Sequence, residues 1–367
     1  MAYKNLLLQL QAKENCLNGP TNCRMSVKND SGSFSNSFAN NKRIMCVGNI
    51  CLDILNYAKY YPKEDEEITV LPDDQIWAMG GNAANSCTIL SQLSESIPTF
   101  LGVLARDHTY QFLSQELKSI GINAQGVVVR EGSKMPVSFA IISAKKATRT
   151  IICCRHDLKE LTFEEFKAFF QKKGNELRSF GWIHFEGRNC TEVRKMMDYV
   201  MSERKRQMIQ IKISVELERK LPEINTLLSG ADVIFLSKDY AMECGMKNME
   251  SAVSEVISWE GIGEKSIVIC AWAEKGAAAA SAAEPKKVIK CPAHPPKAVV
   301  DTLGAGDSFI AGCVHALNRS KPLDKSLEFG CTLAGVKIGV RGLKDLAVHM
   351  VNSKKFKWSA NVMLSTL

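Results

Sequence analysis

The sequence predicts an α/β fold with a mostly parallel central sheet flanked by helices and a small β-sheet lid. Short apolar runs alternate with segments of helical, 3.6-residue apolar spacing along most of the chain. Two segments, 66–79 and 127–154, instead place strand after strand without an intervening helix. With 367 residues and a 46% hydrophobic content, the chain is also long enough to bury a large core.

The elements of the main domain follow from these patterns in chain order. Residues 1–42 are polar and lack periodic apolar positions, so we expect a disordered N-terminal tail. The first strand is expected at the apolar run that starts at Ile44 and ends at Gly48. Later strands are expected at residues 182–185, 211–215, 233–236, 267–271 and 298–300. Helices are expected at residues 86–93, 191–206 and 324–340.

The remaining segments complete the predicted organisation. The main domain spans residues 43–346, and residues 347–367 form a C-terminal extension. Strands within about 54–80 and 127–155 are expected to form the lid, which would exclude water when substrate binds. The alanine-rich segment 276–285 is expected to be a surface connection, and the pair Cys153 and Cys154 is expected to be buried in a lid strand.

Composition excludes several classes of function. The formal net charge is +8, but Lys and Arg are spread along the chain, which argues against a nucleic-acid partner. The 13 cysteines are odd in number and form no C-x-x-C, so neither a disulfide framework nor a zinc site is predicted. Without an apolar run of about 18 residues or a secretory signal, we expect no membrane segment and a cytoplasmic location.

The most informative segment is Gly304-Ala305-Gly306-Asp307, which follows a predicted strand and opens a predicted helix. Glycines allow an anion to approach the backbone, and the first N–H groups of a helix point at it. We expect the helix dipole to keep Asp307 ionised, so that its carboxylate can accept a proton from a bound hydroxyl. An ordinary helix N-cap would explain the same residues, so this segment alone leaves both interpretations open.

A second segment, Gly80-Gly81-Asn82-Ala83-Ala84-Asn85, joins the first lid strands to a helix. Asn82 and Asn85 lie three residues apart, on one side of its first turn, and each amide can both donate to and accept from adjacent hydroxyls. Asp53, expected just after the first strand, offers a third partner. Each residue alone is more often a cap or turn residue, whereas together they suggest a site for a polyhydroxyl compound.

These two segments together resemble those of the ribokinase-like carbohydrate kinases, and the closer resemblance is to the ketohexokinases, or hepatic fructokinases. It extends over about residues 44–345 and includes further matching stretches. These are Leu52-Asp53, Tyr61 to Asp65, His184, Glu186 to Asn189, Ser237-Lys238-Asp239, Cys270 to Glu274 and Val299 to Asp307.

The resemblance implies ATP-dependent phosphorylation of fructose at its first hydroxyl, with Asp307 as the catalytic base and Mg²⁺ bridging the phosphates. It also implies a homodimer that forms through the lid, with Asp65 lent to the site by the second subunit. The implied sugar-binding residues are Asp53, Asp65, Gly81, Asn82, Asn85 and Asp307. The implied ATP-binding residues are Arg149, Ala273, Glu274, Gly276, Gly304, Ala305, Gly306, Cys331 and Ala334.

The chain also departs from the family pattern. Ser237-Lys238-Asp239-Tyr240 stands where the wider family has Asn-x-x-Glu, so the metal-assisting carboxylate is unassigned, with Glu216 and Asp239 as candidates. The lid carries Cys153-Cys154-Arg155-His156 in place of two aromatics, an acid and an arginine, and His294 replaces an aromatic before two prolines. Two alternatives therefore stay open: a kinase for ribose, adenosine or a related polyol, and a catalytically impaired relative that acts as a binding protein.

Overall fold

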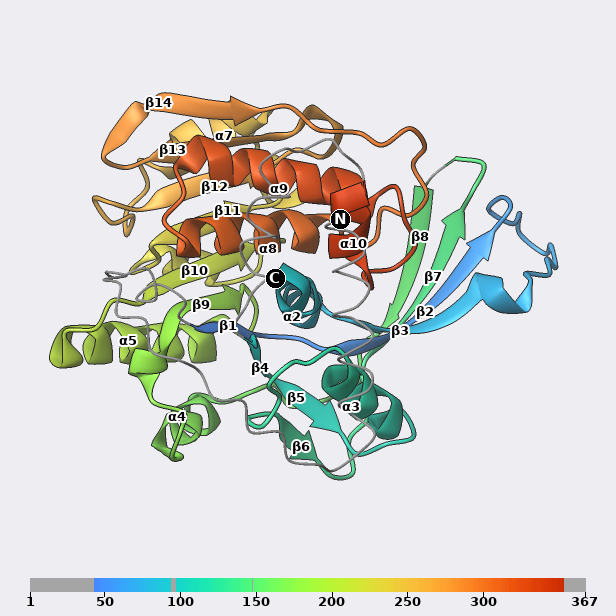
Figure 1. Ribbon diagram of the computed structural model, residues 1–367, viewed down its shortest axis with the longest axis horizontal. Coiled ribbons are helices and arrows are strands. Elements are labelled where there is room, and N and C mark those ends of the chain that lie inside the picture. The colour runs from blue at the N-terminus through green and yellow to red at the C-terminus, as the bar shows by residue number, and fades with distance from the viewer. Residues whose placement is uncertain (1–42, 94–96, 147, 353–367) are drawn as a thin grey trace, which may run out of the picture.

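The computed structural model describes residues 43–93, 97–146 and 148–352 (Figure 1). The expected tail, 1–42, and residues 353–367 of the expected extension lie outside the described residues. An eight-stranded sheet, in the order β14-β13-β12-β11-β10-β9-β1-β4, forms the centre of the main domain. Its strands are β1 (Arg43–Val47), β4 (Thr99–Leu101), β9 (Phe180–Glu186), β10 (Lys212–Leu217), β11 (Val233–Leu236), β12 (Ile267–Ala271), β13 (Ala277–Ser281) and β14 (Glu284–Cys291).

The six neighbouring strands β4, β1, β9, β10, β11 and β12 pair in parallel, and β13 and β14 add an antiparallel edge. Alternate side chains of β1 enter two separate cores, because successive residues of a strand point to opposite faces. One face is covered by α4 (Phe163–Gln171), α5 (Cys190–Gln207), α6 (Lys238–Glu243) and α7 (Met249–Val256). The other is covered by α2 (Asn82–Leu93), α3 (Tyr110–Ser119), α8 (Ala305–Asn318), α9 (Leu323–Lys337) and α10 (Leu346–Asn352).

The lid is a four-stranded sheet in the order β3-β2-β7-β8, which extends from one side of the main domain (Figure 1). Its strands are β2 (Cys51–Ala58), β3 (Gln75–Gly80), β7 (Val137–Ser143) and β8 (Thr148–Cys154). A separate pair, β5 (Val103–Ala105) and β6 (Val128–Arg130), lies outside it. Short 3-10 helices are η2 (Pro72–Asp74), η3 (Leu177–Ser179), η4 (Ile224–Leu228) and η5 (Ala273–Lys275). The predicted fold class is confirmed.

Several detailed expectations are wrong. Residues 298–300 form no strand; instead the N–H of Val300 donates to the carbonyl of Ile338 at 2.7 Å. The alanine-rich segment is not a surface connection, because Ala277 to Ala280 are fully buried in β13, where β14 and α7 pack against them. Segment 66–79 contains only one strand, β3, which continues to Gly80.

The pair Cys153 and Cys154 is exposed rather than buried, because β8 is an edge strand of the lid. The apolar character of this strand therefore does not reflect burial in the main core. No helix among the described residues is long and apolar enough to cross a membrane.

Candidate active site

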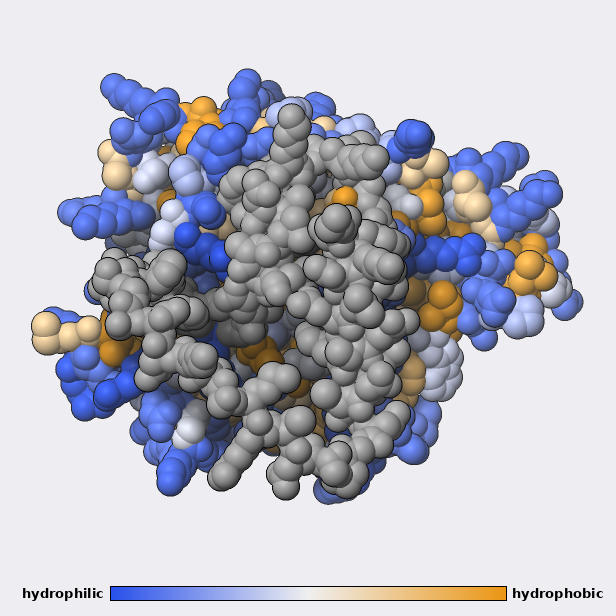
Figure 2. Space-filling model, viewed as in Figure 1, coloured by the Kyte–Doolittle hydropathy of each residue, from blue (hydrophilic) through white to orange (hydrophobic). Residues whose placement is uncertain are grey.

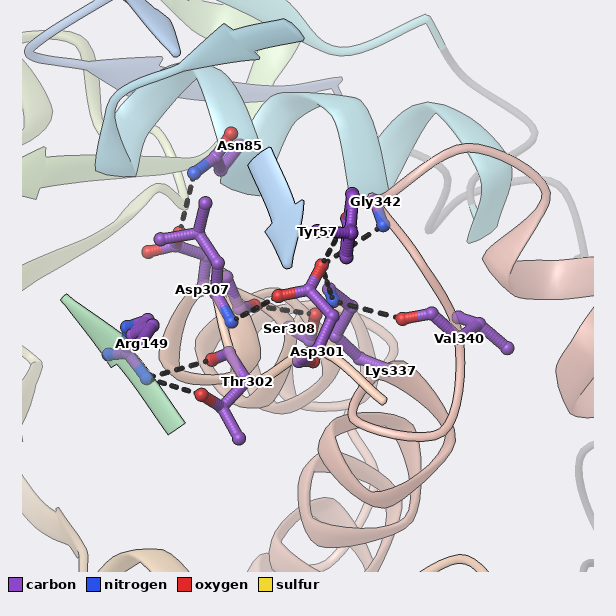
Figure 3. Close-up of polar contacts among 12 residues, drawn as sticks. Tyr57, Asn85, Arg149, Asp301, Thr302, Asp307, Ser308, Lys337, Val340 and Gly342 are labelled. Carbon is purple, nitrogen blue, oxygen red and sulfur yellow. Dashed lines mark hydrogen bonds and ion pairs between the residues drawn. The ribbon is translucent and has the colours of Figure 1, made fainter. Parts of the chain in front are cut away.

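The centre of the site is the pair Asn85 and Asp307, which two helices far apart in the sequence bring together. Helices α2 and α8 pack against each other, and Asn85 Nδ2 on α2 donates a hydrogen bond to Asp307 Oδ2 on α8 at 2.8 Å (Figure 3). Asn85 Oδ1 is buried and has no hydrogen-bond partner among the described residues. This oxygen is therefore a ready acceptor for a hydroxyl of a bound molecule.

Helix α8 begins with the backbone geometry of an anion site. Gly304, its N-cap, has φ +75°, in the left-handed region that glycine adopts without strain. A Cβ built at Gly306 would meet nothing within 4 Å, so the backbone beside it is open to a ligand. The first-turn N–H groups of a helix have no intrahelical partner, so the backbone of residues 304–306 can present donors to an approaching phosphate. The N–H of Ala305 also makes a long contact with the carbonyl of Thr302 at 3.4 Å.

The protonation of Asp307 differs from the expectation. Burial raises its pKa to about 7, and the negative charges of Glu218, Glu186 and Asp53 act in the same direction. The hydrogen bond from Asn85 lowers the pKa but does not outweigh burial. Burial therefore opposes the ionisation expected from the helix dipole, and the carboxyl titrates near neutral pH. A pKa near the working pH suits a general base.

Asp53 lies within lid strand β2 rather than just after β1. Its carboxyl is buried, and burial raises its pKa to about 6. Gly80 on the neighbouring strand β3 faces it, because a Cβ there would overlap the carboxyl of Asp53. A cavity of about 60 Å³ between the lid and the main domain is lined in part by Asp53, Asn85 and Gly304, so these three groups border one hollow.

Asn82 faces a group of carboxylates at the carboxyl ends of the central strands. Its Nδ2 donates to Glu216 Oε2 at 3.3 Å and to Glu218 Oε2 at 3.2 Å. Burial, together with the charges of Asp307 and Glu218, raises the pKa of Glu216 well above its usual range. Glu186, at the end of β9, accepts from the backbone N–H of Asn49 at 2.7 Å.

Glu186 and Glu218 were not predicted as site residues. A signal was present, because Glu186 ends β9 and Glu218 directly follows β10. Ligands of parallel α/β sheets bind beyond the carboxyl ends of the strands. The two metal candidates separate in the structure. Glu216 lies in this carboxylate group, whereas the exposed side chain of Asp239 pairs with Arg219 at 3.3 Å. The described residues contain no group of three or more side chains arranged to hold a metal ion by themselves.

The residues expected to bind ATP lie along three segments. Gly276, after η5, packs against the carbonyl of Cys291, and His294 in turn approaches α9 at Gly335. Cys331 and Ala334 lie on α9, four residues and one residue before Gly335. Ala273 and Glu274 belong to η5, where Glu274 lines a groove of about 430 Å³ with Trp272 and Lys238.

The other expected residues lie at the lid and at the start of α2. Arg149, from lid strand β8, donates to the carbonyl and the hydroxyl of Thr302, beside the start of α8. Gly81 directly precedes α2, and its carbonyl accepts from the N–H of Asn85 at 2.8 Å. Asp65 is exposed in a turn of the lid, and no polar contact joins it to the site within the described part of this chain.

A mostly parallel sheet with a β lid, a helix start open to an anion and an adjacent carboxylate are features of a phosphotransferase. A family model described as the pfkB family carbohydrate kinase matches residues 41–348. The chain belongs to this family of carbohydrate kinases, whose members use ATP. It is 35% identical over 307 residues to the ketohexokinase of Mus musculus, an alignment that covers 83% of this chain and 99% of that protein.

Solved structures support the fold. The chain is similar to the ribokinase of Giardia lamblia, with a TM-score of 0.71, 12% identity, and coverage of 85% of this chain and 99% of that one. It is also similar to the ribokinase of Arabidopsis thaliana complexed with ribose and ATP, with a TM-score of 0.65 and 20% identity. That match covers 86% of this chain and 99% of the Arabidopsis protein. The ribokinase-like fold predicted from the sequence is therefore confirmed.

Proposed function

We propose that this carbohydrate kinase is ketohexokinase-like and transfers the γ-phosphate of ATP to the first hydroxyl of fructose. The main support is the hydrogen bond between Asn85 and Asp307 at the first turn of α8. It places the expected polyol site next to the expected phosphate site. The 35% identity to a ketohexokinase over nearly its whole length supports fructose as the acceptor.

In this mechanism Asp53, Asn82 and Asn85 hold the sugar hydroxyls, and the unpartnered Asn85 Oδ1 accepts a hydrogen bond from one of them. Asp307 takes the proton of the attacking hydroxyl. The amides of residues 304–306 bind the migrating phosphoryl group, whose transition state depends mainly on positioning and on stabilisation of its charge.

ATP lies along the segments that contain Arg149, Gly276, Cys331 and Ala334. Magnesium would neutralise phosphate charge, and the carboxylate oxygens of Glu216 and its neighbours are the kind of ligand that Mg²⁺ prefers. Since these carboxylates form no metal site by themselves, we propose that the ion enters with the nucleotide.

The lid supports the proposed homodimer. Its outer face carries a row of partly exposed apolar side chains, because Ile54 pairs with both Trp77 and Phe139, and Phe139 pairs with Ile152. Figure 2 shows several hydrophobic residues among hydrophilic ones on the protruding lid. A second copy would cover this row, and the proposal includes Asp65 of the partner subunit as a sugar ligand. A cytoplasmic location remains part of the same proposal.

The acceptor decides between this proposal and its alternatives. Purified protein with Mg-ATP should release ADP fastest with fructose, compared with ribose and adenosine at equal concentration, and ³¹P NMR of the product should show a phosphate ester at the first carbon. Preferred turnover of ribose or adenosine would contradict the fructose assignment. Absence of turnover on all three, with ATP still bound, would favour a catalytically impaired binding protein.

A further inference from the structure

The three residues that precede the anion-binding start of α8 all contact the lid, and Figure 3 shows the polar contacts of Asp301 and Thr302. Asp301 Oδ2 accepts a hydrogen bond from the hydroxyl of Tyr57, on lid strand β2, at 3.0 Å. Thr302 accepts from Arg149 of β8 through its hydroxyl at 2.7 Å and its carbonyl at 3.3 Å. Leu303 packs against the small core inside the lid, formed by Leu55, Tyr57, Ala140 and Ile142.

Asp301 is also held from the main domain. Lys337 Nζ, on α9, donates to Asp301 Oδ2 at 3.0 Å and to its carbonyl at 2.9 Å. The side chains of this ion pair are 0% and 1% exposed. The N–H groups of Leu303 and Gly342 donate to the same carboxylate at 2.9 and 3.1 Å. The carboxylate therefore has a saturated and fixed set of partners.

The hydroxyl of Tyr57 is a dependable donor in this setting. Burial and the charge of Asp301 both raise the pKa of Tyr57 above its usual range, so the proton stays on the tyrosine. Arg341 lies over the same ring at 4.3 Å and pairs with Asp74 of η2 at 2.7 Å. Through Tyr57, the lid thus contacts two segments of the main domain, 301–303 and 337–342.

A buried ion pair loses much of its Coulomb energy to desolvation, so its main effect here is orientation rather than stability. Residues 301–303 lead directly into Gly304, and their backbone sets the direction of the first amides of α8. A shift of the lid therefore acts on the phosphate-binding amides through one short segment. A displacement of about 1 Å in such a group can cost about a hundredfold in rate.

We propose that Asp301 is a positioning residue that couples the lid to the phosphate-binding start of α8 through Tyr57, with Lys337 as its fixed counter-ion. The inference rests on the proposed binding of the ATP phosphates at α8. Nucleotide bound there restrains the lid. By linkage, a sugar that closes the lid raises the affinity for nucleotide by the same factor by which nucleotide raises the affinity for the sugar.

Tyr57→Phe tests the coupling, because it removes one hydroxyl and keeps the ring in the lid core. Tyr60→Phe is the matched control, since its hydroxyl donates to the exposed Glu66, also in the lid. We expect the non-hydrolysable analogue AMP-PNP to slow hydrogen exchange of the β2 amides about tenfold in wild type and in Tyr60→Phe, and by less than about twofold in Tyr57→Phe. Equal protection in all three proteins would overturn the proposal.

A second measurement uses the acceptor sugar. Calorimetry should show that saturating fructose strengthens AMP-PNP binding in wild type and that Tyr57→Phe removes most of this enhancement while the melting temperature stays near that of Tyr60→Phe. A merely structural role would lower the melting temperature and leave the enhancement unchanged. If fructose does not bind, the acceptor assignment fails, whereas the exchange experiment, which needs only the nucleotide analogue, still decides the coupling.

Discussion

At the residue scale, the ionisation of Asp307 governs the proposed chemistry. Its pKa of about 7 is the result of burial among other carboxylates, with one opposing hydrogen bond from Asn85. A base must be deprotonated to accept a proton, so the active fraction rises as the pH rises through 7. The enzyme is therefore expected to gain activity between slightly acidic and slightly alkaline pH.

We predict that kcat at saturating substrates rises with pH and levels off above about 8, as expected for a single base with a pKa near 7. Asn85→Ala removes the hydrogen bond that favours the ionised form, so its kcat profile should shift to higher pH. Steady-state rates between pH 5.5 and 9 measure both profiles. Identical midpoints for the two proteins would separate Asn85 from the ionisation of Asp307.

Individual residues show what sequence reasoning could and could not reach. The glycines and Asp307 are adjacent in the sequence, so their local geometry followed from helix-start chemistry. The pKa of Asp307 did not, because it depends first on burial in the folded protein and then on the charges of Glu218 and Glu186, which lie at the ends of β10 and β9. The sequence predicted a helix dipole that favours the ionised carboxylate. It could not predict the burial of Asp307, which favours the protonated form.

At the scale of elements, the outer face of the lid should determine the oligomeric state. Phe139→Glu places a charge in the middle of the apolar row formed with Ile54, Trp77 and Ile152. We expect this variant to elute as a monomer where wild type elutes as a dimer, measured by size exclusion with light scattering. Met208→Glu changes another exposed apolar residue, at the end of α5, and should leave the dimer intact. Equal masses for both variants would contradict a lid interface.

Strand β13 makes a prediction about stability. Its alanines are fully buried, so a larger side chain there must displace packed neighbours. Ala279→Leu should lower the free energy of unfolding by about 1–3 kcal/mol through overpacking. Ala283→Leu, in the exposed turn between β13 and β14, should change it by less than about 0.5 kcal/mol. Urea denaturation compares the two; similar values would show that the space around β13 is loose.

The same strand shows why element prediction failed there. Alanine favours helices and loops over strands, and a run of alanines carries no alternation of apolar and polar residues. Only the surrounding elements make Ala277 to Ala280 a strand, because it completes the sheet between β12 and β14. By contrast, β11 and β12 contain β-branched apolar runs whose limits the sequence predicted to the residue.

At the scale of the whole molecule, the alternation of apolar runs and helical stretches was sufficient to predict the parallel sheet and its lid. The pattern could not predict which strand ends converge, since that depends on the strand order. The resemblance to ribokinase-like kinases supplied this missing long-range information. The residues that it implied along α2, α8 and α9 lie on helices that cover one face of the same sheet.

The most direct test of the central claim is the turnover number of Asp307→Asn with Mg-ATP and fructose at pH 8. Asp307 has a folded pKa of about 7, above its ordinary 3.8, so its ionisation destabilises the fold as the pH rises through this range. The variant should therefore be at least as stable as wild type at pH 8, which a thermal melt checks. We predict a kcat lower by about a hundredfold to ten-thousandfold; a folded variant with the parent's kcat would contradict the assignment of Asp307 as the base.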